Sequence, residues 1–407
     1  MKSDMINFCE YLTYRKESLF LDDVKLSKIP SRFSTPIYCY SVRQIKDNFK
    51  ILKDTFKKMN PLICYALKAN FNPKIVQTLS KLGAGMDVVS GGELRLSNEC
   101  GVDKNKIVFS GVGKTEDEIN FAISHQIKQI NVESVEELEE IDAICNSLNK
   151  KMDISLRVNP NVDAQTLEKI STGRSEDKFG IPESDILEMF RRFKKNKYLN
   201  INGLSIHIGS QIKSLKPFEQ AFHKIKILIL QIRKEGFNCD ILDVGGGIAI
   251  QYNLDDTTSF TISDYVRAVE KYFSKLEINL ILEPGRYLVG QSGILLSKVV
   301  RVKKGKEKDF LIIDAGMNNL IRPSLYNAQH SILALERTKK KVIYDVVGPI
   351  CETSDIFQKN AKLEQMKKND LLAICSTGAY SSCMSSDYNL RGIAKEILID
   401  GKKILET

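Results

Sequence analysis

The chain has 407 residues, 43% of them hydrophobic and 27% charged, so we expect two globular domains with cores of ordinary size. Its net charge is +9, but the 60 Lys and Arg residues are spread along the chain, which argues against a nucleic-acid-binding protein. The nine Cys show no C-x-x-C spacing, which argues against a zinc site or a disulfide framework. We find neither a signal peptide nor a membrane-spanning apolar stretch, and expect a cytoplasmic protein.

Short apolar, β-branched segments alternate with helical patterns between about residues 60 and 290. We predict eight strands, at Leu62–Ala66, Met86–Val89, Ile107–Ser110, Gln129–Val132, Ile154–Val158, Leu204–Ile208, Ile241–Val244 and Leu280–Glu283. The predicted helices are Pro73–Leu82, Gly92–Cys100, Thr115–Ser124, Val135–Leu148, Ser184–Phe193, Phe218–Lys234 and Ile262–Phe273. Eightfold alternation predicts an α/β fold, the (β/α)8 TIM barrel, with an open doubly wound sheet as the alternative.

Two signals support the predicted helix starts. Ser134 precedes a helical run with Glu137 three residues later, which predicts a capping box. Pro73 follows Asn72, which is the usual arrangement of a proline in the first helical position.

After residue 290 the pattern changes to strands with few helices between them. The predicted strands are Ile294–Val302, Phe310–Ile313, Val342–Val347, Leu371–Ile374 and Ile397–Ile399. We therefore expect a barrel over residues 36–290 and a C-terminal β-domain, a β-barrel or sandwich, over residues 291–407. Residues 1–35 precede the barrel, and we expect this N-terminal segment to pack with the β-domain.

A TIM barrel places its active site at the carboxyl ends of its strands, so the residues that follow each predicted strand are the candidates. Four such positions carry polar or glycine-rich sequences: Lys68, His207, the run Gly245-Gly246-Gly247, and Glu283-Pro284-Gly285-Arg286. Each has a plain structural reading, as a surface lysine, a core histidine, a tight turn or a salt-bridged turn. Their predicted convergence at one mouth favours an active site.

The residue types suggest specific chemistry. Lys68 follows an apolar run, where burial would lower its pKa and free the amine for covalent bonding to a carbonyl group. Three glycines after a strand expose backbone amides that can hold a phosphate. We expect Arg286 to keep Glu283 ionised, so that this carboxylate could pair with a protonated ring nitrogen. Together these groups suit pyridoxal 5′-phosphate (PLP), whose protonated ring accepts electrons when CO2 leaves an amino acid.

From about residue 36 to 400 the chain resembles the fold type III PLP-dependent decarboxylases, and within them the diaminopimelate decarboxylases. The motifs that carry the resemblance include Tyr65-Ala66-Leu67-Lys68, His207-Ile208-Gly209-Ser210-Gln211, the glycine run and Glu283-Pro284-Gly285-Arg286. The resemblance implies that Lys68 holds the cofactor covalently and that His207 stacks on its ring. Ser210, Gly245, Gly246, Gly247 and Gly285 would contact the cofactor around its phosphate, and Glu283 would pair with the ring nitrogen. Arg286 would lie between the phosphate and a substrate carboxylate.

Further motifs of the resemblance lie after residue 315, in Gly316–Pro323, Gly348–Asp355 and Tyr388-Asn389. They imply that Arg322 and Tyr326 bind the substrate, that Cys351 donates a proton, and that Glu352 binds the far end of the substrate. Tyr388 would touch cofactor and substrate. By the same resemblance Cys351 and Glu352 enter the neighbouring subunit's site, so we expect a homodimer.

The sequence departs from the family pattern at two places. Asn319 stands where an Asp is common, and Gly392 stands after Arg391 where a proline is often found. Neither position is a proposed catalytic group, so the departures concern loop shape and oligomer detail.

The resemblance implies decarboxylation of meso-2,6-diaminopimelate to L-lysine, the last step of lysine biosynthesis. Another basic amino acid, such as ornithine, arginine or carboxynorspermidine, is the first alternative substrate, but it would leave Arg322 without a carboxylate to bind. Alanine racemase is a second alternative, against which Glu283 argues, because racemases place an arginine at the ring nitrogen. An inactive PLP-binding homologue is a third, against which Lys68 and Cys351 argue.

Overall fold

The computed structural model of the chain describes residues 4–6, 9–164, 166, 172–174, 176–253 and 256–406. Its contacts divide the chain into two compact units. The barrel unit consists of Phe49–Ala249 and Thr258–Gly285. The β unit consists of Met1–Asn48, Ile250–Thr257 and Arg286–Thr407.

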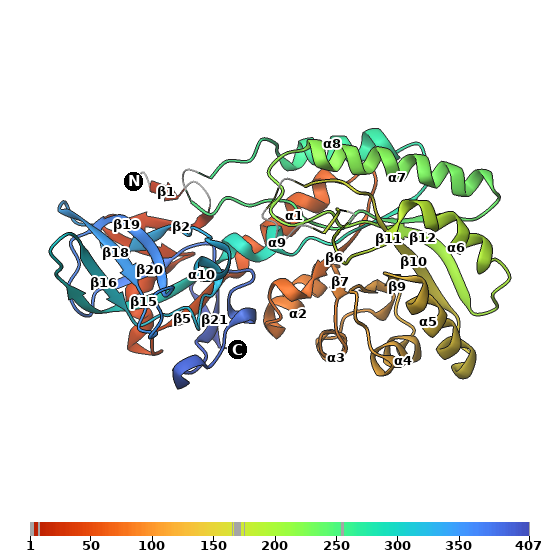
Figure 1. Cartoon of the computed structure of the whole chain (residues 1–407). Helices are drawn as coiled ribbons and strands as arrows, with labels where there is room; N and C mark the ends of the chain where they lie inside the picture. The colour runs from red at the N-terminus through yellow and green to blue at the C-terminus, as the bar shows by residue number, and fades with distance from the viewer. Residues whose placement is uncertain are drawn as a thin grey trace. The chain divides into compact units, whose positions relative to one another are not determined.

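Within the described residues, eight parallel strands close the barrel unit into a ring (Figure 1). In ring order these strands are β6 (Leu62–Ala66), β7 (Gly85–Val88), β8 (Ile107–Phe109), β9 (Gln129–Val132), β10 (Met152–Asn159), β12 (Leu199–Ser205), β13 (Ile241–Asp243) and β14 (Asn279–Leu282). The ring closes because β14 pairs with β6, where Leu282 faces Ile63, and the short β11 (Ile181–Pro182) adds to the end of β10. The predicted (β/α)8 barrel is confirmed, and the open-sheet alternative is wrong because a parallel pairing joins β9 to β10.

Helices α2 (Pro73–Lys81), α3 (Gly91–Glu99), α4 (Glu116–His125), α5 (Val135–Leu148), α6 (Ile186–Arg192), α7 (Lys216–Lys234) and α8 (Ile262–Phe273) alternate with the strands, and Figure 1 shows α3, α4 and α5 outside the ring. Asn72 caps α2 before Pro73, as predicted. The capping box predicted at Ser134 is only half formed. The Ser134 hydroxyl accepts from the amide of Glu137, but the Glu137 carboxylate binds the Lys114 ammonium and the amide of Glu133 instead.

The β unit is built on a mixed sheet, in which some strand pairs are antiparallel and others parallel. Its strand order is β19-β18-β16-β15-β5-β21-β22, and β20 pairs with both β15 and β17. These strands are β5 (Ile37–Ser41), β15 (Gly293–Lys303), β16 (Asp309–Ile313), β17 (Ile332–Ala334), β18 (Lys341–Val347), β19 (Ile356–Glu364), β20 (Leu371–Ile374), β21 (Lys395–Asp400) and β22 (Lys403–Glu406). A second sheet joins β1 (Asp4–Ile6), β2 (Cys9–Arg15), β3 (Ser18–Leu21) and β4 (Val24–Lys25). Two short helices, α9 (Arg286–Val289) and α10 (Arg322–Tyr326), complete the unit.

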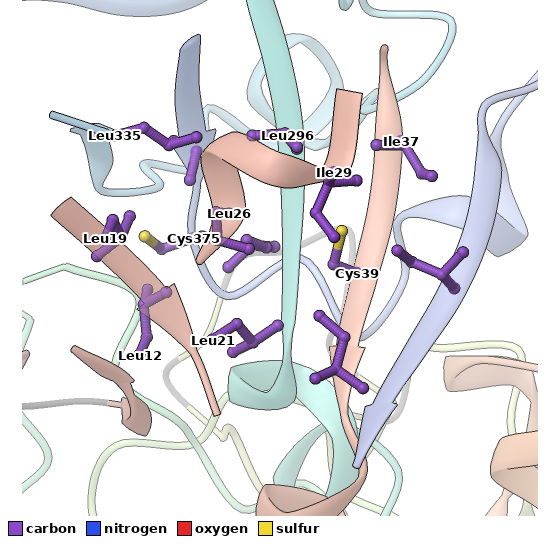
Figure 2. Packing of buried hydrophobic residues seen from close by; sticks show 14 of the residues in the cluster. Leu12, Leu19, Leu21, Leu26, Ile29, Ile37, Cys39, Leu296, Leu335 and Cys375 are labelled. Carbon is purple, nitrogen blue, oxygen red and sulfur yellow. The ribbon is translucent and has the colours of Figure 1, made fainter. Parts of the chain in front are cut away.

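The core of the β unit joins chain segments that are far apart in sequence (Figure 2). Leu12, Leu19 and Leu21 of the second sheet pack with Leu296 of β15 and Leu335.

The division of the chain differs from the boundaries expected at residues 35 and 290. It runs through α1 (Val42–Thr55), because β5 hydrogen-bonds to both β15 and β21 and so belongs to the β unit.

Among the described residues, no helix combines the length and the apolar character that crossing a bilayer requires.

Candidate active site

The barrel unit encloses a cavity of about 400 Å³ at the carboxyl ends of its strands. Its lining residues come from seven of the strands or the segments that follow them: Lys68, Val89, Ser110, Gly111, Val112, Gly113, Asn131, Arg157, Thr172, Phe179, Ser205, Ile206, His207 and Glu283. Three of the residues proposed from the sequence, Lys68, His207 and Glu283, therefore share one cavity, as a TIM barrel predicts.

Lys68 lies in a single 3-10 turn, Leu67–Ala69, that directly follows β6. Its side chain is 34% exposed, and its Nζ lies 2.8 Å from Oδ2 of Asp87, which is fully buried at the end of β7. The sequence analysis expected a buried amine, whereas the structure leaves this side chain partly exposed and places its amine in an ion pair with Asp87. Asp87 was missed, although a charged residue inside the predicted strand Met86–Val89 was a signal for it.

His207 lies two residues beyond the end of β12, which ends at Ser205, earlier than predicted. The amide of Gly246 donates to His207 Nδ1 at 3.2 Å, so Nδ1 is the unprotonated nitrogen. Burial, followed by the charges of Lys68 and Arg157, holds the pKa of His207 well below its ordinary value. The cavity therefore contains a neutral, flat imidazole.

The glycine run shapes this wall of the cavity. A Cβ at Gly246 would overlap with the carbonyl oxygen of Glu283, so the close approach of these two segments requires a glycine. The amide of Gly245 donates to Asp243 Oδ1 at 2.9 Å, and that of Gly246 donates to His207. Two of the three amides expected to face a phosphate are thus engaged with side chains, and among the described residues the amide of Gly247 has no hydrogen bond.

Ser210 and Gly285, two further residues proposed from the sequence, lie next to these segments. The loop that carries Ser210 is tied to the glycine run, because the amide of Ile212 donates to the carbonyl oxygen of Gly247 at 2.9 Å. A Cβ at Gly285 would lie 3.0 Å from the Cβ of Ala69, so Gly285 allows the segment after β14 to pass close to the turn that carries Lys68.

Glu283 follows β14 and lies in a buried polar network inside the ring. Its Oε1 accepts from Ser110 Oγ at 3.1 Å and from Asn131 Nδ2 at 3.3 Å. Burial, and then the neighbouring Asp243 and Asp87, raise the pKa of Glu283 well above its ordinary value. The expectation that Arg286 keeps Glu283 ionised is therefore corrected, because the charge that favours the ionised form here is that of Lys68.

A buried ion pair between Arg157 of β10 and Glu133 forms another wall, and the sequence analysis missed it. Glu133 binds Arg157 Nη1 through Oε1, and its Oε2 accepts from the amide of Gly180 at 2.8 Å. The guanidinium of Arg157 also covers the ring of Phe179, at 4.8 Å from its centroid. Glu133 thus binds both the guanidinium of Arg157 and the backbone at the end of the 176–180 segment, beside the cavity. The signal was a charged residue, Arg157, inside the predicted strand Ile154–Val158.

In the β unit, four residues form an arginine site, which consists of Tyr252, Arg286, Arg322 and Tyr380. Arg286 begins α9 and donates to the hydroxyl of Tyr252. Its guanidinium also lies 4.6 Å from the ring centroid of Tyr380, and that of Arg322 lies 4.6 Å from the ring centroid of Tyr252. Both arginines are buried, and the pKa of Arg322 is lowered by burial and then by the charge of Arg286.

Tyr326, at the end of α10, lies close enough to both arginines to influence their ionisation. Among the described residues, Arg322 has no carboxylate partner. Two like charges enclosed together are unfavourable unless an anion joins them. The arrangement is therefore suited to bind a carboxylate or a phosphate.

The predicted proton donor Cys351 lies on an exposed loop of the β unit, with Glu352. Asp355 organises the loop, because its two carboxylate oxygens accept from the amides of Met317 and Ile350, each at 2.7 Å. The loop is joined to a second turn, since Tyr388 donates its hydroxyl to Glu352 Oε1 at 2.7 Å. Cys351, Glu352 and Tyr388 are therefore brought together in the β unit.

The barrel cavity fits PLP on structural grounds. Ser205 Oγ and Asp87 Oδ1 are buried and have no hydrogen-bond partner among the described residues, so they are open to a further group. Lys68 supplies an amine, His207 a neutral flat ring, and Glu283 a buried carboxyl group. A residue of each chemical type that the cofactor needs is thus present in one cavity.

Comparison with known proteins gives the same cofactor. A family model for the pyridoxal binding domain of pyridoxal-dependent decarboxylases matches residues 42–290. The diaminopimelate decarboxylase of Aquifex aeolicus is 41% identical over 97% of this chain and 93% of that protein. The structure of diaminopimelate decarboxylase from Helicobacter pylori, complexed with L-lysine, is 41% identical over 93% of this chain and 95% of that chain, with a TM-score of 0.90. The structure of diaminopimelate decarboxylase from M. jannaschii is 34% identical over 99% of this chain and 94% of that chain, with a TM-score of 0.92.

Proposed function

Because the chain belongs to the pyridoxal-dependent decarboxylases, and within them to the diaminopimelate decarboxylase family, we propose that it converts meso-2,6-diaminopimelate to L-lysine and CO2. The cofactor is PLP, and the reaction would be the last step of lysine biosynthesis. The observation that carries the choice of substrate is the buried guanidinium of Arg322, which has no carboxylate partner among the described residues. A substrate with a second carboxylate supplies that partner.

The arginine site favours diaminopimelate over the other basic amino acids. Ornithine and arginine have no carboxylate besides the one that is lost, so they would leave Arg322 buried without an anion, which is costly. A planar guanidinium can bind a carboxylate through two parallel hydrogen bonds. We therefore assign the distal carboxylate to Arg322, with Arg286 beside it and Tyr326 near both, and the distal ammonium to Glu352.

In the barrel unit, PLP when bound supplies the electron sink that accepts the electrons left by the departing CO2. Lys68 would hold the cofactor, and His207 would present its neutral ring face to it. The raised pKa of Glu283 implies that it shares a proton with Asp243 until a cationic group enters the cavity, and a ring nitrogen that carries a proton is such a group. Ser210, Gly247 and Arg286 are the proposed phosphate contacts.

Cys351 would protonate the carbon that loses CO2. In the β unit this thiol is exposed, and the amide of Cys351 lies 3.5 Å from Asn389 Oδ1. The segment that follows Asn389 carries two exposed apolar side chains, Leu390 at 89% and Ile393 at 65% exposure. Leu390 also has a positive φ, which is uncommon for a residue other than Gly, Asn or Asp. An exposed, strained apolar turn next to a proposed catalytic thiol is what an interface between two copies of the chain requires. We therefore propose a homodimer in which Cys351, Glu352 and Tyr388 complete the partner's site.

The shared site can be tested with two inactive variants, Lys68→Ala and Cys351→Ala. If the two residues act in one site from different subunits, mixing the variants under conditions that exchange subunits restores part of the activity, because some dimers carry one intact site. If both residues act within one subunit, the mixture stays inactive. Analytical ultracentrifugation of the wild type gives the oligomeric state independently.

The reaction itself is tested by measuring CO2 and L-lysine release from meso-diaminopimelate by the purified protein with PLP. We expect lysine from the wild type and none from Lys68→Ala. A protein that binds PLP but forms no lysine would contradict the substrate assignment. Release of D-amino acids without CO2 would instead indicate a racemase.

We also propose a cytoplasmic location, which the composition predicts. Cell fractionation should recover the protein with a cytoplasmic marker enzyme. Recovery with the membrane fraction after a high-salt wash would contradict this assignment.

A further inference from the structure

His330 is a buried residue of the β unit to which the proposed function gives no role. It lies between α10 and β17, eight residues after Arg322, and its ring touches the arginine site twice. Arg322 Nε lies 3.4 Å from His330 Nε2. The ring of Tyr252 packs edge-on against the imidazole, with the two centroids 5.0 Å apart. On its other side, His330 Nδ1 lies 2.8 Å from the carbonyl oxygen of Cys375, which directly follows β20.

The two hydrogen-bond partners determine the protonation of the ring. A carbonyl oxygen can only accept, so Nδ1 of His330 carries the proton that it donates to Cys375. The Nε of an arginine can only donate, so Nε2 is the acceptor of Arg322. His330 is therefore neutral and in one tautomer. Burial, followed by the charge of Arg322, lowers the pKa of His330 to about 3, so the ring is neutral at neutral pH.

These contacts leave one part of the Arg322 guanidinium available. Its Nε is taken by His330, and one face of the group is covered by the ring of Tyr252 at 4.6 Å. In the part of the chain that the structure describes, neither terminal nitrogen, Nη1 or Nη2, makes a hydrogen bond. The edge that bears these two nitrogens is the one that binds a carboxylate through two parallel bonds.

We propose that His330 is a positioning residue, which orients Arg322 so that its two terminal nitrogens face the distal carboxylate of the substrate. This inference rests on the proposed function, and it deepens it by naming the residue that holds the specificity-determining arginine. An arginine side chain has several rotatable bonds, and holding it in the bound geometry beforehand lowers the entropy lost on binding. The charge of Arg286 opposes this placement, so an acceptor at Nε is needed to keep Arg322 in position.

The test uses the holoenzyme, four single variants and one double variant. His330→Phe keeps a flat ring against Tyr252 but removes the acceptor, whereas His330→Gln keeps an oxygen that can accept from Arg322. Arg322→Leu removes the group on which His330 would act. His125→Phe is the matched control, because His125 also bonds a backbone carbonyl through Nδ1, at 2.9 Å, but lies on the exposed surface of α4 in the barrel unit.

The measurements are KM and kcat for meso-diaminopimelate, and the calorimetric Kd of L-lysine. Lysine keeps the distal carboxylate after CO2 has left, so its binding reports on Arg322 without turnover. We expect His330→Phe to raise both KM and Kd about tenfold, the loss of one hydrogen bond to a charged group, and to change kcat little. His330→Gln should recover most of the loss, and the control should match the wild type. PLP content should be unchanged in all variants.

The double variant Arg322→Leu/His330→Phe separates positioning from a general structural role. If His330 acts through Arg322, adding His330→Phe to Arg322→Leu raises Kd no further. The inference is overturned if His330→Phe raises Kd as much in the Arg322→Leu background as in the wild type. It is also overturned if His330→Phe alone leaves KM and Kd unchanged. In both cases the proposed function stands. Should His330→Phe not fold, Kd of His330→Leu, which also removes the acceptor, gives the same comparison in the two backgrounds. A wild type that neither forms nor binds lysine overturns the proposed function, and the inference falls with it.

Discussion

Substitution of Lys114 by Met tests how the barrel unit supports the wall of its cavity. The side chain of Lys114 is fully buried. Its Nζ donates to the carbonyl oxygens of Gly111 and Asn131, at 2.7 and 2.8 Å, and to Glu137 Oε1 at 2.6 Å. Gly111 and Asn131 line the cavity, so one ammonium ties two segments of its wall to α5. Met has a similar length and keeps the packing while it removes all three bonds.

The expected cost follows from this burial. Removing one partner of a buried ion pair costs about 3–5 kcal/mol, because the other charge stays enclosed without compensation. For a unit of this size, each kcal/mol lowers Tm by roughly 2–4 °C. We therefore expect the barrel transition of Lys114→Met to shift down by about 10 °C at neutral pH, measured by calorimetry on the apoprotein.

The decrease in Tm caused by Lys114→Met should also depend on pH. Burial already raises the pKa of Glu137, and the charge of Lys114 opposes this effect, so removing Lys114 raises the pKa further. A carboxyl group whose pKa is higher in the folded than in the unfolded state binds an extra proton when folded, and the resulting stability is lost as the pH rises through the folded pKa. The variant should therefore lie closer to the wild type at pH 5 than at pH 8.

The control is the double variant Lys114→Met/Glu137→Gln, which removes the enclosed charge but keeps an acceptor for the amide of Glu133. We expect it to regain more than half of the lost Tm at pH 8. A double variant no more stable than Lys114→Met, or an equal deficit at pH 5 and pH 8, would refute this reasoning.

Three further predictions concern the site. Between pH 5 and pH 8, the Tm of Glu283→Gln apoprotein should fall less than the Tm of the wild type. The reason is that the raised pKa of Glu283 gives the wild type stability that is lost as the pH rises. Parallel curves of Tm against pH for the two proteins would contradict this. Gly246→Ala should lower Tm by several degrees and weaken PLP binding, measured by fluorescence titration, because its Cβ would overlap with the Glu283 carbonyl oxygen; unchanged binding would be inconsistent with the described turn. Leu390→Glu should shift the protein toward the monomer in ultracentrifugation, and an unchanged sedimentation coefficient would exclude this turn from the interface.

Much of the fold could be predicted because the barrel strands are parallel and covered on both faces. Such strands read as continuous apolar runs, and all eight were placed within a few residues of their observed positions, apart from the earlier start of β12 at Leu199. Strands β5 and β19 were not predicted. β19 includes exposed polar residues such as Lys359 and Asn360, so its pattern resembles a loop.

The candidate site was predicted where a residue type and its place after a strand pointed to the same chemistry, as for Lys68, His207 and Glu283. The carboxylates next to Lys68 and Glu283, namely Asp87 and Asp243, were missed, as was the ion pair of Arg157 with Glu133. Their effect depends on which carboxylates meet inside the ring, and no local pattern contains that information. The expected ionisation of Glu283 was wrong for the same reason, since its sequence neighbour Arg286 is engaged with Tyr252, while burial and then Asp243, forty residues away, raise the pKa of Glu283.

The amino-acid sequence by itself determined the alternation of strands and helices and the barrel class, and it pointed to Lys68, His207 and Glu283 as candidate site residues, because these follow from periodicity and side-chain chemistry along the chain. Only the tertiary structure decided the protonation of Glu283, the tautomers of His207 and His330, and the orientation of Arg322. These properties depend on burial and on charges or hydrogen-bond partners that come from distant parts of the chain. Burial removes the water that would otherwise screen such neighbours, so their arrangement in space controls the chemistry of each group.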